Sequence, residues 1–130
     1  MELPNSFRTF EDLECWQACR ELRLFVAKKV VAVLPREERY ALGDQLLRAG
    51  RSTTANIAEG YGRFHYADQI KYCRQSRGSA YEVLDHLITG ADEELLPTKL
   101  QDEGRLVVEK AVKLINGYIR YLSNRKAEGK

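Results

Sequence analysis

The chain lacks a long apolar run, a leader-like start and a paired metal-ligand motif, and each absence excludes a class of protein. No run of about eighteen apolar residues occurs, so we expect no membrane-spanning helix. The opening residues show no basic segment followed by an apolar one, so we expect no secretory signal and a cytoplasmic protein. Only two histidines occur, and neither has a glutamate three residues before it. A carboxylate-bridged two-metal centre is therefore not expected, and no cofactor is.

Proline, glycine and cysteine are also scarce. With 3 prolines and 9 glycines among 130 residues, long irregular stretches are not expected. The three cysteines, Cys15, Cys19 and Cys73, form no CxxC pair and have no neighbouring histidine. We expect them to be reduced thiols that pack as small apolar side chains. The length is typical of one domain, covering residues 1–130.

Apolar residues recur every three or four positions over four stretches, and this spacing predicts helices. The predicted helices cover about residues 11–33, 37–59, 66–89 and 97–123. Pro35, Gly60 and Gly90 are interpreted as helix ends, and Pro97 suits the first turn of the last helix. Because the helices are similar in length and the connections short, we predict an all-α, antiparallel, up-down-up-down four-helix bundle.

A regular polar row on the second predicted helix does not suit a plain bundle. If the second and third helices turn around residues 61–63, Arg48 lies near Arg77 and Gly78, and Gln45 lies near residues 80–82. Arg48, Gln45 and Glu82 are then expected to form a network, since buried polar groups need partners. Either a polar layer that fixes helix register or an interface between subunits explains the row. Its residues are Gln45, Ser52, Asn56, Glu59, Gly78, Ser79 and Glu82.

Charge is unevenly distributed although the net charge is only +2. Residues 45–78 carry 6 basic and 2 acidic side chains, and residues 110–130 carry 6 and 1. Residues 79–109 carry 2 basic and 8 acidic side chains, whereas residues 1–44 are nearly balanced, with 7 and 8. This segregation predicts one basic and one acidic face.

Three strings, residues 45–49, 56–63 and 77–82, resemble the four helix bundle protein family, which includes proteins encoded in intervening sequences of bacterial 23S rRNA genes. The likeness covers about residues 7–122, and Asn-Ile-Ala-Glu-Gly at residues 56–60 is its most specific part. Ser76 departs from the alanine expected there. The resemblance implies a ring-like homopentamer. It also implies a distant likeness to the accessory proteins of diversity-generating retroelements, which bind nucleic acid and a reverse transcriptase, so such an enzyme or another protein is a candidate partner.

We expect the protein to bind nucleic acid, with RNA favoured, rather than to catalyse a reaction. Lys71, Arg74 and Arg77 lie three residues apart and predict a basic row on the third helix, although Arg77 also falls in the apolar seam. Tyr66 and Tyr72 are candidates for stacking on unpaired bases, with ordinary packing as the alternative. The predicted binding residues are Arg48, Arg51, Arg63, Lys71, Arg74 and Arg77, with a second group of Lys110, Lys113, Arg120, Arg125 and Lys126.

Three other functions are compatible with parts of the sequence. A scaffold module would use the charged faces for self-assembly, with residues 79–109 docking on a basic neighbour. Membrane-surface binding by the last helix is less favoured, because its broad apolar stripe suits a core. Catalysis is disfavoured because Ser52 and Ser79 have no histidine within helical reach. An active site would have to form between subunits, from Arg48, Glu59 and Arg63.

Overall fold

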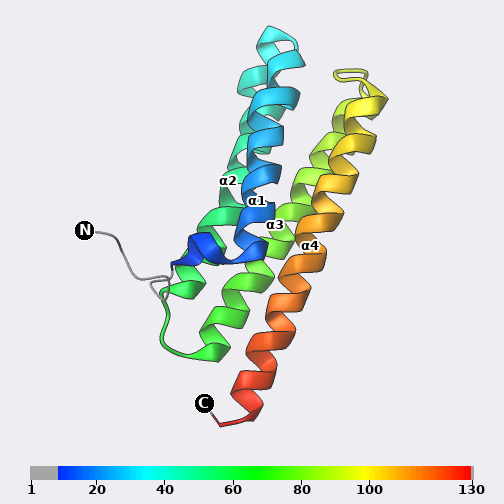
Figure 1. The fold of residues 1–130 in the computed structure, drawn as a ribbon. Coiled ribbons are helices and arrows are strands. Elements are labelled where there is room, and N and C mark those ends of the chain that lie inside the picture. Colours follow the sequence, from blue (N-terminus) through cyan, green and yellow to red (C-terminus); the bar gives the residue numbers. More distant parts are fainter. Residues whose placement is uncertain (1–8, 130) are drawn as a thin grey trace, which may run out of the picture.

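The computed structural model describes residues 9–129 and confirms an all-α four-helix bundle (Figure 1). The four long helices are α1 (Glu14–Phe25), α2 (Leu42–Tyr61), α3 (Tyr66–Asp92) and α4 (Thr98–Ala127), and no strand occurs among the described residues. Each helix packs against two neighbours, in an up-down-up-down order. The α2–α3 connection and the end of α4 lie at one end of the bundle, and the other two connections lie at the opposite end.

The first predicted helix, at residues 11–33, is present but not uniform. A 3-10 turn, η1 (Phe10–Asp12), stands apart because Leu13 is extended, so α1 begins three residues late. After α1 the backbone continues through a π-helical turn, η2 (Val26–Val30), and a 3-10 turn, η3 (Val31–Val33). Leu34 is extended, as expected for a residue before proline.

The second predicted helix starts later than residue 37. Residues 36–40 form a 3-10 helix, η4 (Arg36–Tyr40), and Ala41 leaves helical geometry before α2 begins. Gly60 does not end α2, which continues to Tyr61. A Cβ at Gly60 would lie 2.9 Å from the Cβ of Tyr72, so this glycine serves the close approach of α2 and α3 rather than a cap.

Gly90 does not end α3 either. A Cβ there would lie 2.7 Å from Leu96 Cδ2, so the glycine gives room to the connection packed beside it. The helix ends at Asp92 in a Schellman motif, in which Leu95 N–H donates to Gly90 O at 2.8 Å and Glu94 N–H donates to Ala91 O at 3.1 Å. Glu94 holds the left-handed position, with φ of 60°.

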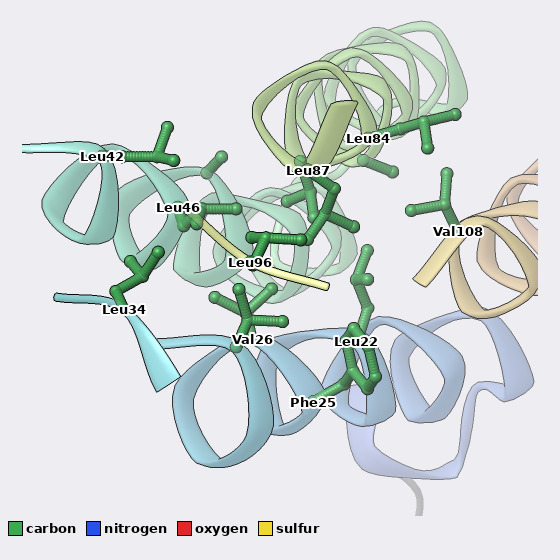
Figure 2. Close-up of a cluster of buried hydrophobic side chains, with 14 of the residues drawn as sticks. Leu22, Phe25, Val26, Leu34, Leu42, Leu46, Leu84, Leu87, Leu96 and Val108 are labelled. Atoms are coloured by element: carbon green, nitrogen blue, oxygen red, sulfur yellow. The ribbon is translucent and has the colours of Figure 1, made fainter. Parts of the chain in front are cut away.

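The buried apolar side chains of the four helices form two clusters. One lies toward the α1–α2 and α3–α4 connections and is built around Leu22, Phe25, Leu46, Leu87 and Val108 (Figure 2). Burying each such side chain stabilises the fold by about 1.5–3 kcal/mol. The second cluster includes the three cysteines, Ile57, Ile70, Ile115 and Leu122. The apolar residues that recur every three or four positions are largely buried, but Val33, which shares this spacing at the end of the first predicted helix, is 50% exposed.

The register between α2 and α3 is fixed near the middle of the bundle. Ser76 donates to Thr53 O at 2.8 Å, and the hydroxyls of Ser52 and Ser79 share a hydrogen bond of 2.7 Å. The residue numbers of α2 and α3 at one level therefore sum to about 130. The predicted level of Arg48 with Arg77 and Gly78 corresponds to a sum of about 125. Because α2 ends later than predicted, the turn lies later in the chain, and Arg48 is not level with Arg77 and Gly78.

Candidate nucleic-acid interface

Charge in the α3–α4 hairpin divides along its length rather than between two faces. Residues 66–78 and 113–129, the basic half, carry 7 basic and 2 acidic side chains. Residues 79–112, the acidic half, carry 3 basic and 8 acidic side chains. The bond from Arg77 Nη1 to Asn116 Oδ1, at 2.7 Å, marks the boundary between them. Two basic segments that are distant in sequence thus meet at the end of the bundle where α4 finishes (Figure 1).

A cavity in the basic half brings together cations from the two predicted groups. It has a volume of about 510 Å³ and opens between the start of α3 and the end of α4. Arg74, Ser123 and Lys126 line it, together with the apolar residues Ala67, Ile70 and Ala127. Within residues 9–129 neither Arg74 nor Lys126 has an ion-pair partner. Two free cations and a hydroxyl around one cavity suit a phosphate group.

Arg125 lies near this cavity but is partly engaged. Its Nη1 is 3.5 Å from Glu128 Oε1, and a hydrogen bond with Tyr66 raises the pKa of the guanidinium. The buried Nε has no hydrogen-bond partner in the described part of the chain. Arg125 therefore adds positive potential here while it anchors Tyr66.

Arg63 is held at the α2–α3 connection by two neighbours. Its Nη2 lies 2.9 Å from Glu59 Oε2 and donates to the Tyr72 hydroxyl at 2.8 Å. The guanidinium also lies over the Tyr72 ring, 5.0 Å from its centroid. Tyr72 is consequently covered on this side, and Tyr66 packs against the second core cluster. Both predicted stacking tyrosines are half-buried and engaged within the chain, which supports the alternative of ordinary packing.

The other predicted cations are spread over the bundle. Arg77 bonds to Asn116, so Arg74 has the one guanidinium of the predicted row without a side-chain partner among the described residues. The ammonium of Lys71, the third member of the row, lies 5.9 Å from the Tyr72 ring centroid. Arg48 and Arg51 are exposed on α2, about 20 Å from Arg63 along the helix. Of the second group, Lys110 pairs with Glu21, and Lys113 and Arg120 are exposed.

The predicted polar row resolves into separate local contacts. Ser52 and Ser79 bond to each other, and Asn56 Nδ2 donates to the carbonyl and the hydroxyl oxygens of Ser52, both at 2.9 Å. The network of Arg48, Gln45 and Glu82 is wrong. Arg48 lies 3.8 Å from Asp44, one turn earlier, and Glu82 bonds to His86, one turn later.

Two members of the row remain open to contacts outside the chain. Gln45 is exposed, and a Cβ added at Gly78 would meet nothing within 4 Å. Glu59 is exposed and serves Arg63. The Ser52–Ser79 bond supports the interpretation as a register-fixing layer, while the bare surface at Gly78 suits a closely approaching partner.

Sequence reasoning missed Phe64, which is 90% exposed in the α2–α3 connection. The connection is fixed around it, because Gln69 Nε2 donates to Arg63 O at 3.0 Å and Arg63 N–H donates to Gly60 O at 3.0 Å. An aromatic residue in a predicted turn, two residues after Gly62, was the available signal.

The three cysteine thiols, the candidate nucleophiles of the chain, are buried. Burial raises the pKa of the Cys15 and Cys73 thiols to about 12, and it also raises the pKa of Cys19. These thiols pack as apolar groups, as predicted. Among residues 9–129 no group of three His, Cys, Asp or Glu side chains has metal-site geometry. None of the described helices has the length and apolar composition needed to cross a membrane.

Comparison with protein families identifies the family of the chain. A family model described as 23S rRNA-intervening sequence protein matches residues 11–117, which is most of the chain. No curated protein matches the chain significantly.

Proposed function

Since the chain belongs to the 23S rRNA-intervening sequence protein family, we propose that it is a non-catalytic RNA-binding protein whose ligand lies on the basic half of the α3–α4 hairpin. The observation that carries this proposal is the meeting of Arg74 and Lys126, both free of ion pairs within the described residues, around one cavity. The family description names an rRNA context, and a phosphate backbone is the ligand that such paired cations attract.

The charge division favours a defined orientation of the polyanion. The basic half attracts phosphates, while the 8 acidic side chains of residues 79–112 repel them. RNA should therefore approach the end of the bundle formed by the α2–α3 connection and the end of α4. Several copies on one RNA would multiply a weak contact made by each.

The test compares two charge reversals in a labelled-RNA binding assay over a range of salt concentrations. Arg74→Glu combined with Lys126→Glu removes the paired cations. Arg36→Glu combined with Lys99→Glu reverses the same charge at the opposite end, on exposed residues. We expect the first pair to weaken binding at least tenfold and to reduce the salt slope by about 0.7 for each phosphate of a single-stranded RNA that is no longer neutralised. The control pair should change affinity less than threefold.

Two results would contradict the proposal. One is the absence of RNA binding by the unaltered protein at low salt. The other is an equal loss from both pairs of reversals, because binding would then follow net charge and not the basic half. Circular dichroism on each variant checks that the bundle stays folded.

We also propose self-association, because an apolar groove of about 370 Å³ lies between α1 and α4. Leu24, Phe25 and Val107 line it, and Lys29 and Glu103 form an ion pair of 2.9 Å beside them. Leu24 belongs to neither core cluster of the described residues, so its apolar surface is available to a second copy. This location differs from the charged faces that the sequence suggests for a scaffold.

Light scattering after size exclusion tests self-association. The unaltered protein should show a multiple of 14.9 kDa, and Leu24→Glu should shift the mass toward one copy. Val33→Glu, on another exposed apolar residue, should leave the mass unchanged. A single-copy mass for the unaltered protein at all concentrations would refute association, and a shift from Val33→Glu alone would place it elsewhere.

A further inference from the structure

Phe64 has an exposed ring, and no packing contact within the described part of the chain explains why a phenylalanine stands there. Exposing a phenylalanine forfeits about 1.5–3 kcal/mol that burial would provide. The ring is 90% exposed, yet the backbone is fixed on both sides of it. Arg63 bonds to Gly60 and to the Gln69 side chain, and Gln69 N–H donates to His65 O at 3.1 Å. The rings of Phe64 and His65 lie nearly perpendicular, with 5.0 Å between centroids, and the Phe64 side chain stays 90% exposed beside this neighbour. The fold thus presents an aromatic face to solvent from a held connection.

The chain that runs from Arg63 past Phe64 into α3 is basic. Residues 63–77 carry four basic side chains and one acidic side chain, Asp68. Glu59, the nearest acidic residue on α2, is engaged by Arg63. The basic side chains would add little affinity for an apolar protein partner, whereas a nucleic acid would bind through both the ring and the cations.

We infer that Phe64 is a stacking platform for an unpaired nucleobase, so that the ligand is single-stranded RNA rather than a duplex. In a duplex the base faces are already stacked on each other and cannot reach a protein ring. In a single strand a base can stack on Phe64 while its backbone follows the cations of the basic half. This inference rests on the proposed RNA binding and adds which form of RNA is bound. Phe64 would take the role that the sequence suggests for Tyr66 and Tyr72.

Fluorescence anisotropy with two labelled RNAs tests the inference, namely an unstructured oligoadenylate and a duplex of equal length. Phe64→Ala should weaken binding of the single strand about 5- to 100-fold, as expected for one stacked base, and change duplex binding less than twofold. Phe64→Tyr should retain most of the affinity, because a flat ring remains. Tyr40→Ala, which removes another exposed ring at the opposite end, should have no effect.

A second measurement reports stacking directly. Phe64→Trp places an indole at the platform, and its fluorescence should fall as oligoadenylate is added. The unaltered protein, whose one tryptophan is Trp16, should respond much less. The inference is overturned if Phe64→Ala binds the single strand as the unaltered protein does, or loses both RNAs equally.

The two proposals fail in distinguishable ways. If the unaltered protein binds neither RNA at low salt, RNA binding itself is refuted. If the reversal of Arg74 and Lys126 abolishes binding but Phe64→Ala does not alter it, RNA binding stands and the stacking role is refuted. A fall in oligomer mass caused by Phe64→Ala would assign the ring to contact between copies, and would likewise overturn the stacking role.

Discussion

Arg77 donates a hydrogen bond of 2.7 Å from Nη1 to Asn116 Oδ1 across the α3–α4 interface. The bond holds one guanidinium of the basic row that three-residue spacing predicts on α3 against α4. It leaves Arg74, one turn earlier, as the free guanidinium of that row. At the boundary between the basic and acidic halves, Arg77 therefore stabilises the packing of α3 on α4.

The Arg77–Asn116 bond predicts a loss of stability from either truncation. Arg77→Ala and Asn116→Ala should each lower the free energy of unfolding by about 1–2 kcal/mol, because a part-buried charged hydrogen bond is removed. The double variant should lose less than the sum, since both changes remove one interaction. Urea denaturation of the four proteins measures the coupling.

Binding data separate this role of Arg77 from that of Arg74. Arg77→Ala should change RNA affinity less than Arg74→Ala does, once each variant is measured well below its unfolding transition. Additive stabilities in the double variant, or a larger binding loss at Arg77, would contradict the structural assignment.

Two glycines predict opposite outcomes for the same substitution. Gly60→Ala should destabilise the bundle by about 1–3 kcal/mol, because the new Cβ would lie 2.9 Å from the Cβ of Tyr72 and 3.2 Å from Gln69 O. Gly78→Ala should stabilise it by up to about 1 kcal/mol, since this exposed helix position has open space around it. Thermal unfolding of both variants measures the difference.

The same pair of variants bears on the surface at Gly78. Should copies approach closely there, Gly78→Ala would raise monomer stability yet reduce the oligomer mass. An unchanged mass would leave Gly78 outside any contact between copies. Stabilisation by Gly60→Ala would show that α2 and α3 pack less tightly than the structure has them.

Sequence periodicity predicted the fold class because the apolar spacing of all four helices is clear. Leu22, Leu46, Leu87 and Leu122 are all buried as expected. Helix ends were less predictable, because glycine was interpreted as a stop signal. Gly60 and Gly90 instead give room for a neighbouring side chain, which depends on contacts with distant residues.

The candidate site was predictable only in part, for a similar reason. Composition identified Arg74 and Lys126 as basic residues, but only the packing of α3 against α4 brings them to one cavity. Pairing between helices also depends on the fold, and so the bond of Arg77 to Asn116 could not be recognised from the sequence. Ser76, which stands where the family resemblance predicts alanine, is buried and donates to Thr53 O. Serine and alanine are similar in size, so the sequence did not suggest this bond.

The end of α3 predicts a stabilising substitution. Glu94 occupies the left-handed position of the Schellman motif, with φ of 60°, where glycine has no steric penalty. Glu94→Gly should raise the free energy of unfolding by about 0.5–1 kcal/mol. Glu93→Gly removes the same charge at a residue with φ of −90° and should not stabilise. A gain of equal size from both would attribute the effect to charge.

The buried thiols predict a loss of stability at alkaline pH. Burial raises the pKa of Cys15 and Cys73 from 9.0 to about 12, so above pH 9 the unfolded chain releases protons that the folded chain retains. Stability from this source is complete below pH 9 and is lost as the pH rises toward 12. At about 1.4 kcal/mol per pH unit, each thiol should lower the free energy of unfolding by about 1–2 kcal/mol at pH 10.5. Urea midpoints at pH 8 and pH 10.5 measure the change.

A matched variant isolates the thiols from other groups that titrate in this range. Cys15→Ala combined with Cys73→Ala should be less stable at pH 8, because two buried side chains become smaller. It should nevertheless lose less stability than the unaltered protein between pH 8 and pH 10.5, since neither thiol remains to ionise in the unfolded chain. In the unaltered folded protein, alkylation by iodoacetamide at pH 8 should be slow and should become fast in urea. Rapid labelling without denaturant, or an equal pH-dependent loss in the double variant, would show that the thiols are not buried as the structure places them.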